Sequence, residues 1–188
     1  MRRERKLAEI CRSIAAGNEK LKWMLPIWTP SCAEFANNHR AVKDATKPLQ
    51  RLMLDFDEKG HSLEILERSL LLQKEGKWEI LLVEESVRKG THVLITLPDG
   101  MSPQEAQNRF SHDVGFQADP SLKDVARCIY MVPESYTLFV NEALFAPHPN
   151  VIFRTESSTT RQSEAKNLGN TKLDEYVDAS EILRRDAP

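Results

Sequence analysis

The sequence predicts a mixed α+β protein whose core elements follow the order β-α-β-β-α-β. Three observations predict this fold class. Large apolar residues recur at every second position in segments 51–57 and 91–97, helical spacing follows the first of these segments, and a capping box opens at 102–105. With 188 residues, 40% of them hydrophobic and 29% charged, the chain has the size and composition of about one globular domain.

Residues 1–49 are expected to form a helical and irregular extension that packs on the core. Apolar residues recur at helical spacing in 3–16, a short second helix is expected over 20–25, and prolines interrupt the rest. The basic start is followed by an amphipathic helix instead of an apolar signal core. Because no run of 18 apolar residues exists either, we expect a cytoplasmic protein with no membrane partner.

The core is expected to span residues 50–147 and to begin with a strand from Arg51 to Asp57. Alternation along this strand places three large apolar side chains on one face and three other side chains on the opposite face. The first set is Leu52, Leu54 and Phe56, and the second is Met53, Asp55 and Asp57. Ser62 is then expected to cap a helix that carries Leu63, Leu66 and Leu70 on one stripe.

The second half of the predicted core contains three strands and one helix. Strands are expected over 78–83 and 91–97, joined by a polar turn at 84–90. The capping box Ser102-Pro103-Gln104-Glu105 opens a helix that should run to about His112, and residues 127–132 form the last strand.

This order is that of the split βαβ, or ferredoxin-like, arrangement. Its two helices are expected to cover one sheet face and leave the other open. The first and third strands should then be central neighbours, with the fourth strand beside the first. A fifth strand is expected over 136–140. Residues 148–188 are expected to be a polar, mobile tail with a short helix over 173–185.

Asp55 and Asp57 are the strongest candidates for chemistry. They lie two residues apart at the end of a strand, so their carboxylates share a face and repel by roughly 4 kcal/mol at an effective dielectric of 20. A bound cation would offset this repulsion, and carboxylate oxygens favour Mg²⁺ or Mn²⁺. The alternative is a solvated strand end before a turn. The three cysteines include no CxxC pair, so a zinc knuckle is not indicated.

The turn between the second and third strands supplies candidate phosphate ligands. It carries Arg88 and Lys89, with Ser86 before them and His92 after them at the start of the third strand. If Val93 and its alternating neighbours pack under the helices, His92 lies on the opposite face beside the two aspartates. A simple polar hairpin turn with a structural histidine is the alternative. Because the chain's formal charge is −2, phosphate binding requires a local basic patch.

A third carboxylate is expected just before the fourth strand. Asp119 precedes Pro120, which also fits a helix cap, and Asp124 competes for the same role. Arg127 begins the strand, where it could contact a phosphate or the acidic cluster.

Taken together, these motifs resemble those of a known superfamily. A strand-borne DxD, an SxRxGxH and a small residue before Asp follow the motif order of archaeo-eukaryotic primases and primase-polymerases. The chain is also similar to the VirE N-terminal domain family of bacterial mobile elements. That likeness rests on Leu25-Pro26, on the strand that ends in Asp55-Phe56-Asp57, and on the DxxR of Asp124 to Arg127. It covers roughly residues 15–147.

The resemblance implies an RRM-like core and a primase-like nucleotidyltransferase that acts on single-stranded DNA during mobile-element replication. Nucleoside triphosphates would be its substrates, and Mg²⁺ or Mn²⁺ its cofactors. The metal ligands and catalytic residues would be Asp55, Asp57 and Asp119. Phosphates would be bound by Ser86, Arg88, Lys89, His92 and Arg127. No GxxxxGK[ST] motif occurs, so a VirE-type helicase domain is expected to be supplied in trans.

Two rival functions are also considered. A catalytically inactive module on the same fold could hold nucleotides or single strands, although the strands show few exposed aromatic residues. A haloacid-dehalogenase-like phosphatase also uses DxD after an apolar strand. That chemistry usually has Thr two residues after the second Asp, where this chain has Lys59.

Overall fold

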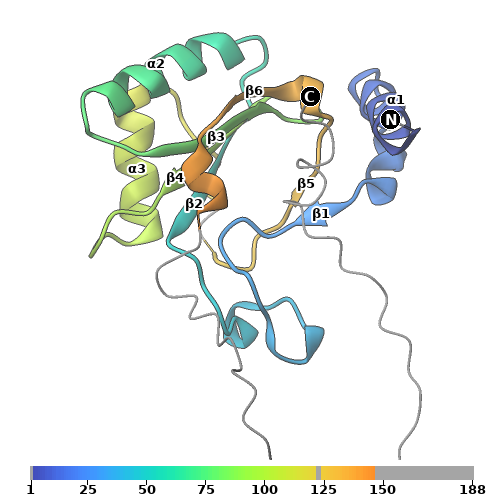
Figure 1. Ribbon diagram of the computed structural model, residues 1–188. Coiled ribbons are helices and arrows are strands. Elements are labelled where there is room, and N and C mark those ends of the chain that lie inside the picture. The colour runs from blue at the N-terminus through green and yellow to red at the C-terminus, as the bar shows by residue number, and fades with distance from the viewer. Residues whose placement is uncertain (1, 122–123, 147–188) are drawn as a thin grey trace, which may run out of the picture. The chain divides into compact units, whose positions relative to one another are not determined.

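The computed structural model describes residues 2–121 and 124–146, which form a mixed α+β architecture with two antiparallel sheets (Figure 1). The strands are β1 (Ile27–Trp28), β2 (Arg51–Phe56), β3 (Ile80–Glu85), β4 (Thr91–Thr96), β5 (Ile129–Tyr130) and β6 (Thr137–Val140). The α-helices are α1 (Arg2–Ala15), α2 (Ser62–Lys74) and α3 (Pro103–Val114). Short 3₁₀ helices are η1 (Glu19–Met24), η2 (Ala36–Asn38), η3 (Val42–Asp44), η4 (Glu134–Tyr136) and η5 (Glu142–Phe145). The predicted tail and its helix lie outside the described residues.

The main sheet has the strand order β2-β4-β3-β6, and every neighbouring pair is antiparallel. Since β4 lies between β2 and β3, the first and third predicted core strands are neighbours, as expected, but β2 lies at the edge of the sheet and not at its centre. The predicted strand 127–132 is reduced to β5, which pairs with β1 in a separate two-stranded sheet. Its expected position beside the first core strand is therefore wrong. The predicted fifth strand is present as β6, at the edge beside β3.

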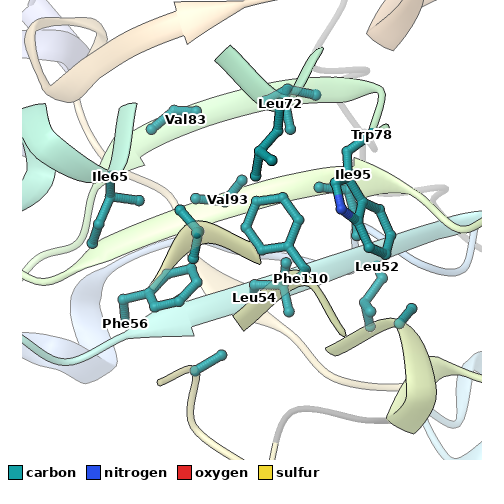
Figure 2. Packing of buried hydrophobic residues seen from close by; sticks show 14 residues of the cluster. Leu52, Leu54, Phe56, Ile65, Leu72, Trp78, Val83, Val93, Ile95 and Phe110 are labelled. Carbon is teal, nitrogen blue, oxygen red and sulfur yellow. The ribbon is translucent and has the colours of Figure 1, made fainter. Parts of the chain in front are cut away.

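The helices α2 and α3 cover one face of the main sheet. Figure 2 shows apolar side chains of β2 and β4, including Leu54, Phe56 and Val93, packed against Phe110 of α3. Their alternation in the sequence places them on this face, which confirms the predicted core side of both strands. The predicted N-cap at Ser102 is also confirmed, because the Ser102 hydroxyl accepts a hydrogen bond from the Glu105 backbone N–H at 3.2 Å.

The opposite face of the main sheet is not open, contrary to the expectation from the sequence. Met53, Leu82 and Leu94 are buried there and pack with Ile129 of β5 and the partly buried Trp28 of β1. Figure 1 shows β1 and β5 on the side of the sheet away from α2 and α3. A short two-stranded layer thus covers part of the face that carries the aspartates.

The N-terminal helices pack on this second layer. Cys11 and Ile14 of α1 form a buried cluster with Leu25, with Val87 of the β3–β4 turn and with Tyr136. Residues 1–144 accordingly cluster as one compact unit. Within the described residues, no helix has both the length and the apolar character needed to cross a membrane.

Two local predictions differ from the structure. Ser62 does not cap α2; it is the first helical residue, and its hydroxyl accepts a hydrogen bond from Thr91 at 2.8 Å. The buried stripe of α2 is centred on Ile65 and Leu72, whereas Leu63 is exposed. Tertiary burial chose this stripe, because both stripes have helical spacing and local sequence does not distinguish them.

Candidate functional site

A row of three ionisable side chains crosses the centre of the main sheet. Asp55 of β2 lies opposite His92 of β4, and His92 lies opposite Glu84 of β3. The Nε2 atom of His92 is 3.8 Å from Oδ1 of Asp55, and its Nδ1 atom is 2.9 Å from Oε1 of Glu84. Because residues opposite each other in an antiparallel sheet share a face, all three side chains lie on the face away from the helices. The predicted proximity of His92 to the aspartate is confirmed.

Burial in this row decreases from β3 to β2. The side chains of Glu84 and His92 are 8% and 7% exposed, whereas that of Asp55 is 24% exposed. Burial alone would lower the pKa of His92. The hydrogen bond and charge of Glu84, together with the charges of Asp55 and Asp57, outweigh this effect and raise that pKa. The two carboxylates on either side therefore favour the protonated form of the imidazole, and its Nε2 atom faces the more accessible of them.

Asp55 has an environment that disfavours its charge. Burial raises the pKa of Asp55, and the neighbouring carboxylates of Asp57 and Asp119 raise it further, although His92 and Arg127 act in the opposite direction. These side chains lie near enough to influence the charge of Asp55, and we call them the electrostatic group at the end of β2.

Asp119 is held in this group by its backbone. Its N–H donates to the carbonyl oxygen of Asp55 at 2.8 Å, and the buried Gln107 side chain of α3 donates to its carbonyl oxygen. Its carboxylate accepts hydrogen bonds from the Ser121 hydroxyl and N–H, and these bonds lower the pKa of Asp119. The side chain of the competing residue, Asp124, instead accepts a bond from the N–H of Ala126.

The predicted phosphate ligands divide into two groups. His92 and Arg127 belong to the electrostatic group at the end of β2. Arg88 instead forms an ion pair of 2.7 Å with Glu19 of η1, and Lys89 pairs with Glu85 at 2.5 Å and lies over the Tyr136 ring. These two cations contact other partners and not the aspartates.

Ser86 and Gly90 close the β3–β4 turn. The Ser86 hydroxyl accepts a hydrogen bond from the Gly90 N–H at 3.0 Å, so this side chain is engaged within the turn. A Cβ atom on Gly90 would lie 2.4 Å from the carbonyl oxygen of Phe56. Glycine is therefore required here because the turn approaches the end of β2, which is a structural reason for this part of the motif.

The carboxylates of Asp55 and Asp57 suit a divalent cation whose remaining ligands are phosphate oxygens and water. They do not suit a metal site in which protein side chains supply every ligand. Within the described ranges, no three His, Cys, Asp or Glu side chains converge as a metal-ligand set. Mg²⁺ is commonly held by one or two carboxylates, with phosphate oxygens and water completing its coordination. Asp55 and Asp57 offer such a pair, and a cation would offset both the burial and the neighbouring carboxylates that raise the pKa of Asp55.

Glu84 is the member of the site that the sequence pattern did not single out. Its position after four apolar residues suggested the start of a turn, whereas β3 continues through Glu85. The register of the hairpin would have revealed it, since a turn centred on Arg88 places Glu84 opposite His92. Comparison of the chain with known proteins finds no matching family model, no matching curated protein and no matching solved structure.

Proposed function

We propose that the chain is a divalent-metal-dependent nucleotidyltransferase of the primase type, which extends a strand on a single-stranded DNA template. The observation that carries the proposal is the group at the end of β2, where Asp55, Asp57 and Asp119 lie with His92 and Arg127. Carboxylates that repel one another suit a divalent cation, and adjacent cationic side chains suit the phosphates of a nucleotide. The resemblance to the VirE N-terminal family and to an RRM-like primase core is part of this proposal.

Each side chain would have a distinct task in this chemistry. Asp55 and Asp57 would hold Mg²⁺ or Mn²⁺, which when bound activates the attacking hydroxyl and stabilises the leaving pyrophosphate. His92 would present its Nε2–H to a phosphate oxygen, because Glu84 already occupies Nδ1. Arg127 would bind a second phosphate oxygen, and the backbone of Asp119 would fix the edge of β2.

The decisive experiment measures nucleotide binding and primer extension on the same samples. Calorimetry with Mn²⁺ and a nucleoside triphosphate is compared between the wild type and the variant Asp55→Asn/Asp57→Asn, which keeps side-chain shape and removes charge. We expect nucleotide affinity to fall by about tenfold or more, since each lost charged contact contributes about 1.5–3 kcal/mol. Extension of a primer on single-stranded template should be abolished.

The control is Glu67→Gln, because Glu67 is an exposed carboxylate on α2 and lies outside the site. This variant should bind and extend like the wild type. A wild type that neither binds the metal–nucleotide complex nor extends primers would contradict the proposal. Full activity in the Asp55→Asn/Asp57→Asn variant would show that the site is assigned to the wrong residues.

A second candidate is a module that binds nucleotides without turnover. It is favoured by one observation: Arg88 and Lys89 pair with Glu19 and Glu85, so fewer cations face the aspartates than a transfer site would use. This candidate predicts metal-dependent nucleotide binding that depends on Asp55, without primer extension under any metal condition.

A further inference from the structure

Apolar side chains are exposed on the outer face of the β1–β5 sheet. Ile27 and Tyr130 lie directly opposite each other in this sheet and are 49% and 37% exposed. The alternate residues, Trp28 and Ile129, pack towards the main sheet, so Ile27 and Tyr130 face away from it. Trp23 of η1, four residues before Ile27, is 80% exposed. We call Trp23, Ile27 and Tyr130 the outer apolar face.

This degree of exposure is unusual for a tryptophan. Indole rings are large and are mostly buried in folded proteins, and Trp23 is followed in the chain by two further exposed apolar residues, Met24 and Ile27. The other two tryptophans follow the rule, since Trp78 is buried and Trp28 is partly buried. Exposed apolar side chains that gather in one segment are typical of a binding surface.

The chain next to the outer apolar face is basic. Residues 1–24 contain seven Lys and Arg residues and three Glu residues, a formal charge of +4, whereas the whole chain carries −2. Five of these cationic side chains are exposed and form no ion pair within the described part of the chain: Arg3, Arg5, Lys6, Arg12 and Lys20. The helix α1 packs against η1, which carries Trp23, and its Ile14 lies in one buried cluster with Leu25. Positive charge is therefore concentrated in the segment that carries Trp23 and in the helix that packs on it.

These two properties together select one class of partner. Single-stranded nucleic acid offers both phosphates for Lys and Arg and unpaired base faces for aromatic rings. An acidic peptide would match the charge but offers no flat faces to Trp23 and Tyr130, and a duplex keeps its base faces stacked inside. We propose that the outer apolar face, with the exposed cations of α1 and η1, is a binding surface for single-stranded nucleic acid.

This binding surface shares no residue with the site at the end of β2. It would bind a single strand whether or not that site catalyses a reaction. The inference builds on the proposed function in one respect, because it assigns the place where a single-stranded template is held. Stacking of a base on an aromatic side chain strengthens binding, and each phosphate contact makes binding more sensitive to salt. Both contributions can be measured independently.

The test uses the full chain and a fluorescein-labelled oligothymidylate of about 20 nucleotides, a length that spans the site sizes of single-strand-binding folds. Anisotropy titrations compare the wild type with Trp23→Ala, Trp23→Phe and Leu63→Ala. Leu63 is a matched control, because it is an exposed apolar residue on α2, away from this layer. We expect Trp23→Ala to weaken binding about tenfold, Trp23→Phe to retain most affinity, and Leu63→Ala to bind like the wild type. Quenching of tryptophan fluorescence should accompany binding, because Trp23 is the most exposed of the three indoles.

Charge is tested with Arg3→Gln/Lys6→Gln, which should weaken binding and flatten its salt dependence. Unchanged affinity in Trp23→Ala would overturn the proposal. So would equal competition by poly-glutamate or by duplex DNA, because the surface would then accept any polyanion. Metal–nucleotide binding should be unchanged in Trp23→Ala. Failure of the proposed function would instead appear as absent nucleotide binding in the wild type, alongside intact, Trp23-dependent binding of the oligonucleotide.

Discussion

Two neighbouring rows on the same face of the main sheet have opposite chemistry. Met53, Leu94 and Leu82 form one row across β2, β4 and β3, and Asp55, His92 and Glu84 form the next row across the same strands. The first row is buried under the β1–β5 layer, where apolar contact stabilises it. The second row is almost as buried, yet it consists of ionisable groups that must satisfy one another. Burial on this face therefore accompanies apolar packing in one row and ion pairing in the next.

The largest loss of stability is expected when one partner of the buried Glu84–His92 pair is removed. Glu84→Ala leaves His92 buried without its hydrogen-bond acceptor, and removing one partner of a buried ion pair costs about 3–5 kcal/mol. The loss should appear in the free energy of unfolding, measured by urea denaturation at about pH 6, where histidine is mostly protonated.

The matching control removes both partners. Glu84→Leu/His92→Leu converts the polar row into a continuation of the apolar one, and such replacements of buried pairs are often neutral or stabilising. We expect its free energy of unfolding to lie within about 1 kcal/mol of the wild-type value, while nucleotide binding is lost. A double variant as unstable as Glu84→Ala would show that apolar side chains cannot replace the polar pair in this row.

The apolar row should respond almost as strongly, through a different mechanism. Leu94 is fully buried, so Leu94→Ala should cost about 3 kcal/mol through lost transfer energy and the cavity left behind. Measured at several pH values, this loss should be constant, because no titrating group is removed. A loss that changed with pH would mean that the apolar row is coupled to its polar neighbour.

An intermediate effect is expected at the turn that joins β3 and β4. Gly90→Ala places a methyl group against the carbonyl oxygen of Phe56, so the end of β2 or the turn must shift. Overpacking of this kind costs about 1–3 kcal/mol, which thermal unfolding in the absence of ligand would detect. If Gly90→Ala is as stable as the wild type but binds nucleotide weakly, the glycine serves phosphate approach and not packing.

The smallest change in the free energy of unfolding is expected when the pH of the wild-type protein is raised. Because the folded-state pKa of His92 is raised, its contribution to stability is fully present below its unfolded value of about 6.5 and is lost as pH rises through the folded value. Unfolding measured from about pH 6 to about pH 9 should show this loss in the wild type and not in Glu84→Leu/His92→Leu. Parallel curves for the two proteins would indicate that His92 is uncharged in the folded state.

Local periodicity predicted much of this molecule. The period of two along β2 and β4 predicted which side chains pack under the helices, and the same period places Asp55 and His92 on the opposite face. The cap at Ser102 and the order of elements through α3 also follow from short-range chemistry. Each of these features depends on residues only a few positions apart in the chain. The sequence by itself therefore determines the strand faces, the cap and the order of elements.

Only the tertiary structure decided the partners of segments that are far apart in the chain. The strands β1 and β5 are two residues long each, so no periodicity identifies them, and their pairing comes from shared burial of Trp28 and Ile129 against the sheet. The same long-range packing turned Arg88 towards Glu19 and buried Glu84 against His92. The sequence therefore determined the faces of the central strands and their candidate carboxylates. Tertiary contacts, which depend on residues distant in sequence, decided which cations join those carboxylates and which surface stays exposed.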